Sequence, residues 1–348
     1  MINRIALLFV TACVVHAQND LPARLDAVVS ARMAERGFMG AVLVAWDGKV
    51  LLEKGYGMAN VEWDIPNTPD TKFRLGSITK QFTATAILQL VERGSLALED
   101  SVGKHVPEAP QSWKPITIHH LLNHTSGIPS YTDSPAFAKP GFRRAPLRPL
   151  EIALLSKDEK LLFQPGEGYR YNNTGYVLLG HIIETLSGMR YDAYLREHVF
   201  SPLEMNDTGY DWTRPVLKKR ADGYGYNRDQ KRYTNSDFLD MSLPHAAGSL
   251  YSTVRDLYKW HRGLSAGKLL SKGSLEKMFK PERSNYGYGW VLEKAKDQVW
   301  AGHGGGIFGF STMILRTVEG DTAIVVLSNV ENGEAAAVAR QLRDALLR

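Results

Sequence analysis

The chain contains 348 residues, and its hydrophobic and charged fractions of 44% and 23% are those of an ordinary globular protein. Its 42 lysines and arginines exceed its 37 acidic residues only slightly and form no basic run, so nucleic-acid binding is not indicated. A chain of this length is expected to form roughly two domains with ample material for a core.

The N-terminal residues are typical of a secretory signal peptide. Arg4 supplies a positive charge, residues 5–10 form an apolar run, and Ala17 ends a small-residue cleavage site. The apolar run is too short to span a membrane. We therefore expect residues 1–17 to be removed and the mature protein, residues 18–348, to be periplasmic or secreted.

The only cysteine of the chain, Cys13, lies inside this signal segment. A mature protein cut after Ala17 would then contain no thiol and no disulfide. Residues 10–13 also resemble a bacterial lipoprotein cleavage site, which makes a lipid anchor at Cys13 the alternative. So early a cysteine leaves a very short signal, and we therefore favour soluble export.

A helix and a hairpin are predicted next. Asp20 caps the helix, and Gly37 lies at its end. The dipeptide Asp47-Gly48 is a strong signal for a two-residue turn, and it stands between the strand-like segments 41–46 and 50–53. We expect two antiparallel strands joined by this turn.

A long apolar helix is predicted to begin at Ser77, with Lys80 one turn further on. Apolar residues recur at helical spacing until Gly94 supplies a stop. Because residues three apart lie on one helix face, the Lys80 amine can lie beside the Ser77 hydroxyl. Burial lowers the pKa of a lysine, and its neutral amine can then take the proton that makes serine a nucleophile. Serine is also a favoured helix cap, and Ser-x-x-Lys recurs at Ser265 and Ser274, so this pattern alone leaves a structural role open.

The segment that follows the Ser77 helix is mainly helical and contains two loops of special composition. Residues 128–150 carry five prolines, and residues 222–237 are rich in tyrosine and glycine. Long ordered loops often form lids or substrate walls, and disorder is the alternative. The arginines of the proline-rich loop are Arg143, Arg144 and Arg148. Further helices are predicted from residue 117 and over 174–186, 191–199 and 252–264.

Tyr171 and Asn173 lie in a tight turn directly before one of these predicted helices. Side chains at such a place can project into a cleft. The alternative roles are core packing for Tyr171 and helix capping for Asn173.

A glycine-rich segment, residues 301–311, lies between two strand-like runs and contains His303. Glycines within a strand often mark the close approach of another backbone or of a ligand. His303 is therefore a candidate to face a cleft, with a neighbouring glycine N–H directed at a substrate. The alternative is a mobile glycine loop with a solvated histidine.

Strand-like runs appear near both ends of the chain. The later runs are residues 288–292, 298–300, 310–315 and 323–327, followed by an alanine-rich helix from about residue 332. We predict an α+β fold, an α/β sandwich whose antiparallel sheet is assembled from both chain ends and flanked by the terminal helices. The sheet subdomain would comprise about 18–71 and 286–348, with a mostly helical lobe of about 72–285 inserted into it.

Three motifs, at residues 77–80, 171–173 and 303–305, resemble in their order and placement those of the serine β-lactamase and penicillin-binding-protein superfamily. The most similar branch is the class C-like one, with D-Ala-D-Ala carboxypeptidases, D-aminopeptidases and β-lactamase-like carboxylesterases. The likeness runs from about Leu21 to the C-terminus. It implies the β-lactamase-like fold and a serine hydrolase that works without a metal or a cofactor.

The resemblance also implies a role for each motif residue. Ser77 would attack a carbonyl to form an acyl-enzyme, which water would then hydrolyse. Lys80 and Tyr171 would share the general-base work, and Asn173 would hold Lys80 and the substrate amide. The oxyanion hole would consist of the N–H groups of Ser77 and Gly306.

The third motif, His303, Gly304 and Gly305, would bind substrate, and it departs from the family pattern at its middle residue. The family often has threonine there, and the hydroxyl helps to bind the carboxylate of a β-lactam or of a D-Ala terminus. A carboxylate that loses such a partner binds about tenfold to a hundredfold less tightly. We therefore expect small-molecule or peptide substrates with ester or amide bonds, and weak or no β-lactamase activity, unless an arginine of the proline-rich loop replaces the hydroxyl.

Other kinds of function have less support. A non-catalytic penicillin-binding-like sensor or binding protein is the first alternative, and a class C-like β-lactamase is the second. His120 and His124 stand one helical turn apart, but no His-Glu-x-x-His pattern accompanies them, so no metal site is expected. There is no Gly-x-Ser-x-Gly elbow, and the glycines at 302–306 precede a strand, which argues against an α/β-hydrolase and a dinucleotide site.

Overall fold

The computed structural model describes residues 21–331 and 334–348. The predicted signal segment, with Cys13, and the predicted cap of the first helix lie outside these residues. The first described helix covers residues 21–36 and ends where Gly37 adopts a positive φ of 66°. Within the two described ranges, no helix has both the length and the apolar character needed to cross a bilayer.

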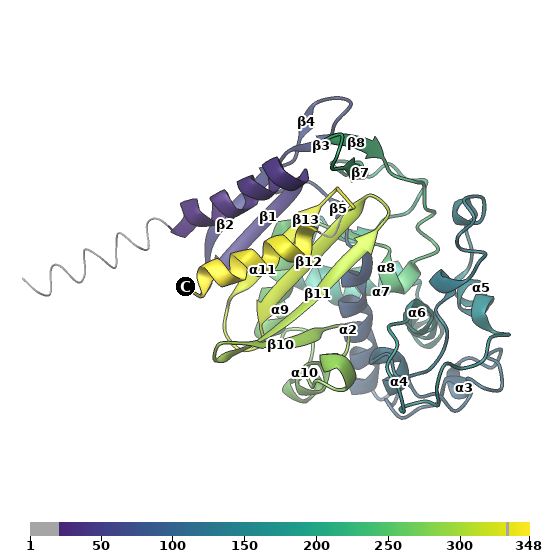
Figure 1. The fold of residues 1–348 in the computed structure, drawn as a ribbon. Coiled ribbons are helices and arrows are strands. Elements are labelled where there is room, and N and C mark those ends of the chain that lie inside the picture. The colour runs from purple at the N-terminus through teal and green to yellow at the C-terminus, as the bar shows by residue number, and fades with distance from the viewer. Residues whose placement is uncertain (1–20, 332–333) are drawn as a thin grey trace, which may run out of the picture.

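A six-stranded antiparallel sheet forms one layer of the fold, with strand order β10-β11-β12-β13-β1-β2 (Figure 1). The prediction that both ends of the chain build this sheet is confirmed, since β1 pairs with β13 from Gly40 opposite Ser328 onward. The predicted turn at Asp47-Gly48 joins β1 to β2. The strands are β1 (Gly40–Trp46), β2 (Lys49–Tyr56), β10 (Val291–Ala295), β11 (Gln298–Ile307), β12 (Phe310–Thr317) and β13 (Ala323–Ser328).

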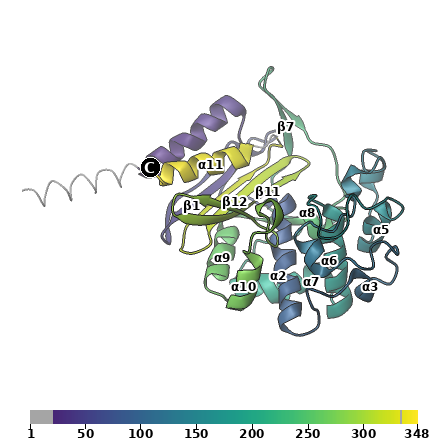
Figure 2. The same ribbon diagram turned by 60° about the horizontal axis from the view of Figure 1, so that its bottom comes forward.

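Helices cover both faces of the sheet, which explains why β1 is apolar at nearly every position. Val42 and Val44 pack into the core beneath the helix at 21–36 and α11 (Glu334–Leu346), whereas Leu43 faces the core of the helical lobe. Figure 2 shows these two helices on one side of the sheet and α9 (Val254–Ser265) on the other. A strand buried on both faces has no polar side to show in its sequence.

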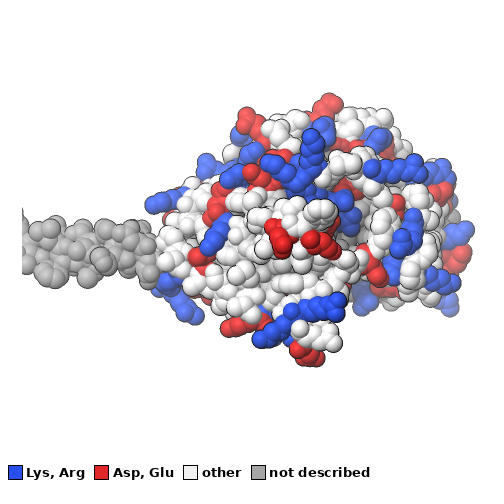
Figure 3. Space-filling view, turned by 90° about the horizontal axis from the view of Figure 1, so that it is seen from above, with Lys and Arg blue, Asp and Glu red and all other residues white. Residues whose placement is uncertain are grey.

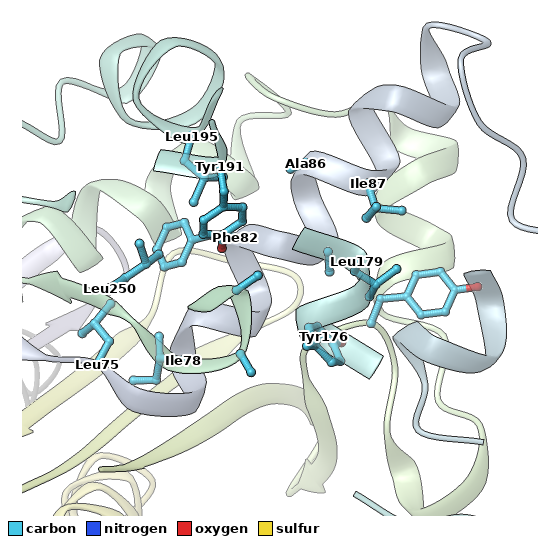
Figure 4. Packing of buried hydrophobic residues seen from close by; sticks show 14 of the residues in the cluster. Leu75, Ile78, Phe82, Ala86, Ile87, Tyr176, Leu179, Tyr191, Leu195 and Leu250 are labelled. Atoms are coloured by element: carbon cyan, nitrogen blue, oxygen red, sulfur yellow. The ribbon is translucent and has the colours of Figure 1, made fainter. Parts of the chain in front are cut away.

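The helix predicted after Ser77 is α2 (Thr79–Glu92), which runs through the middle of the lobe with residues 79–90 buried. Phe82, which Figure 4 shows near Tyr191 and Leu250, also packs against the rings of Trp260 and Phe200, with centroids 4.4 and 5.5 Å away. The buried Thr83 hydroxyl lies 2.7 Å from the Ala246 carbonyl oxygen. A helix enclosed on all sides is a rigid support for the residues at its N-terminus.

The predicted helices near residues 117, 174–186, 191–199 and 252–264 are present. The other α-helices are α3 (Val102–His105), α4 (Ile118–Leu122), α5 (Pro149–Ala153), α6 (Asn173–Ser187), α7 (Tyr191–Leu195), α8 (His245–Gly248) and α10 (Lys272–Met278). Short 3-10 turns are η1 (Gly76–Ile78), η2 (Tyr131–Asp133), η3 (Phe142–Arg144), η4 (Leu154–Ser156), η6 (Ser201–Leu203) and η7 (Arg283–Asn285), and η5 (Arg196–Phe200) is a π-helical turn.

Smaller sheets lie between these helices. They are β3 (Met58–Asn60) with β4 (Ile65–Pro66), β5 (Phe73–Arg74) with β9 (Leu250–Ser252) and β6 (Gly209–Tyr210), and β7 (Tyr224–Asn227) with β8 (Arg232–Asn235). The β7–β8 hairpin lies where the sequence predicted a loop. Its strands pair through the backbone, and the rings of Tyr226 and Tyr233 contact each other across it with centroids 4.9 Å apart. Figure 3 shows acidic and basic side chains interspersed on one face of the molecule, as the small net charge suggests.

Candidate active site

Ser77 lies in the turn η1, directly before α2 rather than within it. The turn packs closely on β11, since a Cβ on Gly76 would lie only 3.0 Å from the Gly306 amide nitrogen. Gly76 also has a φ of +54°, a conformation that favours glycine. This packing exposes Ser77 to a cavity of about 580 Å³ between the sheet and the helical lobe.

The Lys80 side chain is completely buried, and its nitrogen contacts three oxygen atoms. It lies 3.0 Å from Ser77 Oγ, 2.9 Å from Asn173 Oδ1 and 2.8 Å from the Ala247 carbonyl oxygen. Burial lowers the pKa of Lys80 well below its usual 10.5, which favours the neutral amine. A neutral amine has two N–H donors and one lone pair, and two of its three partners can only accept. The lone pair is therefore left for the Ser77 hydroxyl proton.

The Tyr171 ring covers the Lys80 nitrogen, which lies 4.8 Å from the ring centroid. Its hydroxyl is buried and has no hydrogen-bond partner among the described residues. Burial raises the pKa of Tyr171, and the nearby Ser77 hydroxyl opposes this shift to a smaller extent. Tyr171 is thus a neutral phenol beside the serine.

The two neighbouring asparagines have different tasks. Asn172 caps α6 by accepting from the backbone N–H three residues on, at 2.7 Å, so the Asn173 side chain is free of the capping role considered for it. Asn173 accepts from Lys80, and its Nδ2 donates to Thr132 Oγ1 at 3.2 Å. Its backbone N–H donates to Ser130 Oγ at 3.1 Å. These contacts hold the Asn173 amide with its oxygen toward the lysine.

His303 is buried and is not among the residues that line the cavity, so its predicted contact with substrate stays a prediction. Its Nδ1 lies 2.6 Å from the Gly304 carbonyl oxygen, which can only accept, so Nδ1 carries the proton and Nε2 accepts from the Tyr286 hydroxyl at 2.9 Å. Burial and the nearby Lys80 lower the pKa of His303 to about 4, while the bond to Gly304 opposes them. The neutral ring lies beside Tyr171, with centroids 6.0 Å apart, and helps to position it.

The glycines of β11 allow this strand to lie against the turn that carries the serine. A Cβ on Gly305 would lie 1.9 Å from the Leu75 carbonyl oxygen, so the close approach requires glycine. Gly304 and Gly306 line the cavity together with Ser77. The backbone N–H groups of Ser77 and Gly306 therefore belong to one wall, where they can stabilise an oxyanion.

The cavity walls are largely apolar. Glu331 is the one charged side chain among the described residues that line it. The apolar and aromatic lining residues are Tyr131, Phe137, Leu239, Pro244, Ala247, Ile307, Phe308, Phe310 and Ala336.

None of the three arginines of the proline-rich loop lines this cavity. Arg143 pairs with Asp237 at 3.3 Å, and Arg148 pairs with Glu151 at 2.7 Å. Arg144 lies over the ring of an exposed phenylalanine. In this structure, no arginine takes the place of the hydroxyl that is missing at position 304.

The histidines considered as metal ligands do not converge. His120 Nδ1 accepts from the Thr117 backbone N–H, and the fully buried His124 accepts from that of Asn172, each at 3.2 Å. Across the described ranges, no group of three histidine, cysteine or acidic side chains is placed to hold a metal ion.

Known proteins resemble the chain over nearly its whole length. Residues 25–348 match the family described as beta-lactamase. A penicillin-binding protein of Bacillus subtilis (strain 168) is 34% identical over 312 residues, which cover 84% of this chain and 68% of that protein.

Solved structures show the same fold. The D-stereospecific amidohydrolase from Streptomyces sp. superposes with a TM-score of 0.78 at 32% identity, covering 91% of this chain and 96% of that chain. The D-amino acid amidase from Ochrobactrum anthropi SV3, complexed with D-phenylalanine, superposes with a TM-score of 0.82 at 26% identity, covering 94% and 99%.

Proposed function

The chain belongs to the beta-lactamase family, which includes penicillin-binding proteins, and we propose that it is a serine hydrolase that forms an acyl-enzyme on Ser77. The observation that carries the proposal is the buried Lys80 amine 3.0 Å from the Ser77 hydroxyl. Asn173 and the Ala247 carbonyl oxygen accept the two N–H groups of that amine, and this leaves its lone pair directed at the serine.

The reaction would proceed in two stages. Ser77 Oγ attacks the substrate carbonyl carbon as its proton moves to Lys80, and the N–H groups of Ser77 and Gly306 stabilise the oxyanion. The bond to the leaving alcohol or amine then breaks, and the leaving group takes up a proton from Lys80 or Tyr171. Water attacks the acyl-enzyme in the second stage, which releases the acid and restores the serine.

We infer that the substrates are small or peptide-like compounds with ester or amide bonds. Gly304 offers no hydroxyl to a substrate carboxylate, and no lysine or arginine of the described residues lines the cavity. The similarity to an amidohydrolase and an amidase adds weight to amides. Efficient hydrolysis of β-lactams, which carry such a carboxylate, is disfavoured by the same features.

Acylation of the serine tests the proposal. Intact-protein mass spectrometry after treatment with a fluorophosphonate should show one adduct, absent in Ser77→Ala. Ser274→Ala is the matched control, because Ser274 and Lys277 repeat the same spacing away from the cavity, and it should keep the adduct. If folded protein gives no adduct with fluorophosphonates, penicillins or activated esters, the non-catalytic binding protein becomes the better explanation.

We also propose export, on the strength of Arg4, the apolar run at 5–10 and the small-residue site before Gln18. N-terminal sequencing of the mature protein would give Gln18 as the first residue. A lipid-modified Cys13 at that place would instead show an anchored protein.

A further inference from the structure

The charge of the cavity is concentrated on Glu331, which lies in the connection between β13 and α11. The residues that carry the proposed chemistry leave the cavity without a cation. Lys80 is buried outside its lining, and burial lowers the pKa of that amine, which favours its neutral form. Glu331 is an exposed residue, so its carboxylate is accessible to a ligand that enters the cavity.

The Glu331 carboxylate is held in a defined position. Its Oε2 accepts from the Gly309 backbone N–H, in the turn between β11 and β12, and from the Ser236 hydroxyl at 3.3 Å. Its own backbone N–H donates to the Tyr224 carbonyl oxygen at 2.9 Å. Three different segments thus fix Glu331, one of them the turn that follows the strand carrying Gly306, so its carboxylate is pre-organised for a ligand in the cavity.

Arg143, which lies close to one wall residue, is paired with another carboxylate. Its guanidinium lies 4.8 Å from the Phe308 ring centroid and pairs with Asp237. Arg143 itself is not part of the cavity lining. Glu331 would therefore repel an anionic substrate, and no cation in the cavity lining would offset this repulsion. A primary ammonium could instead form an ion pair with the Glu331 carboxylate.

We propose that Glu331 is a specificity-determining residue that selects substrates carrying an ammonium group and rejects substrates carrying a carboxylate. The inference rests on the proposed function, because it names the substrate class of the same cavity. The favoured compounds are aminoacyl amides or esters with a free amino group and an apolar side chain, which suits the aromatic walls.

Three substrates with the same scissile bond and different charges on the N-terminal group test this inference. They are phenylalanine p-nitroanilide, its N-acetyl derivative and its N-succinyl derivative, each in the D and L forms. At pH 6.5, below the usual α-amino pKa of about 7.7–8.0, they carry charges of plus one, zero and minus one. The wild-type protein should show kcat/KM falling in that order, with about tenfold or more between the first and the last.

The variant Glu331→Gln should reduce the ratio of cationic to anionic kcat/KM to near one. Glutamine keeps an oxygen that can accept from the Gly309 N–H, so the turn stays in place, and thermal unfolding verifies the fold. Glu319→Gln removes an exposed acid on the loop between β12 and β13 and should keep the wild-type ratio. An unchanged ratio in Glu331→Gln, or a wild-type preference for the succinyl compound, overturns the inference.

Binding to Ser77→Ala separates this inference from the proposed function, because binding needs no acylation. Calorimetry with phenylalanine amide and N-succinyl-phenylalanine amide should show the same preference, and adding Glu331→Gln should abolish it. If no substrate is hydrolysed but this preference persists, the hydrolase proposal fails and the charge selection stands. If hydrolysis occurs without any preference for the cationic substrate, the hydrolase proposal stands and the charge selection fails.

Discussion

The Lys80 nitrogen donates to the Ala247 carbonyl oxygen at 2.8 Å, across 167 positions of the chain. This contact occupies one of the two N–H groups of a neutral amine, and Asn173 occupies the other. The direction of the lone pair is therefore determined by residues that do no proton transfer themselves.

Replacing the amine should slow acylation strongly without unfolding the protein. Lys80→Met keeps an unbranched side chain of similar length in an apolar surrounding, so the midpoint of thermal unfolding should not fall. Loss of the proton acceptor should slow fluorophosphonate labelling of Ser77 by about 10²- to 10⁴-fold. Stopped-flow or gel-based labelling measures the rate, and a decrease smaller than tenfold would show that another group takes the serine proton.

The buried histidine of the third motif should make stability depend on pH. The pKa of His303 is about 4 in the folded state and near 6.5 when unfolded, so between these values only the unfolded chain gains the proton. The free energy of unfolding should therefore fall as the pH drops through this window, by about 1–3 kcal/mol from this group. Urea unfolding at pH 7 and pH 4.5 gives the difference, and His303→Gln should show a smaller one. Equal differences in both proteins would contradict the prediction.

The Thr132 hydroxyl should matter through Asn173, whose Nδ2 it accepts at 3.2 Å. Thr132→Val keeps the shape of the side chain and removes the acceptor, so the amide is no longer held with its oxygen toward Lys80. We expect kcat to fall by about tenfold, the worth of one hydrogen bond to a buried polar group, with a smaller effect on KM. Thr132→Ser restores the hydroxyl and should recover most of the rate. Equal losses in both variants would indicate a packing role instead.

Position 304 should accept a side chain, whereas position 305 should not. A Cβ on Gly304 would have its nearest atoms at 3.7 Å, so Gly304→Thr adds the hydroxyl that carboxylate-binding relatives use. Acylation by nitrocefin should rise by about tenfold or more. Gly305→Thr is the control, because its Cβ would meet the Leu75 carbonyl oxygen at 1.9 Å, and it should lower the unfolding midpoint. If Gly304→Thr folds but gains no reactivity with nitrocefin, the missing hydroxyl is not what limits acylation by β-lactams.

The parts of the fold that the sequence predicts are those with local signals. The Asp47-Gly48 turn, the periodicity after Ser77 and the short motifs before α6 and within β11 each depend on neighbours in the chain. The β7–β8 hairpin escaped prediction because its glycines and polar residues are typical of loops, whereas its strands are held by backbone pairing and a cross-strand tyrosine contact.

Prediction of the site from the sequence was also limited to residues with local signals. Ser77, Lys80 and Asn173 meet as the motifs suggest, since each lies at the start of a helix that packs in the core. Ser130 and Thr132 carry no such signal, because their place depends on how an irregular segment folds over α6. The partner of the His303 ring carries no sequence signal either, because Tyr286 reaches it from a separate segment.

The contact between Gly76 and Gly306 joins the first quarter of the chain to a strand in its last quarter. During synthesis the serine turn emerges long before the strand on which it rests, so the reactive centre cannot assemble until almost the whole polypeptide is available. Contacts of such long sequence separation are slow to form. A nascent or truncated chain should therefore be inert toward acylating compounds, which keeps the nucleophile unreactive until folding is nearly complete.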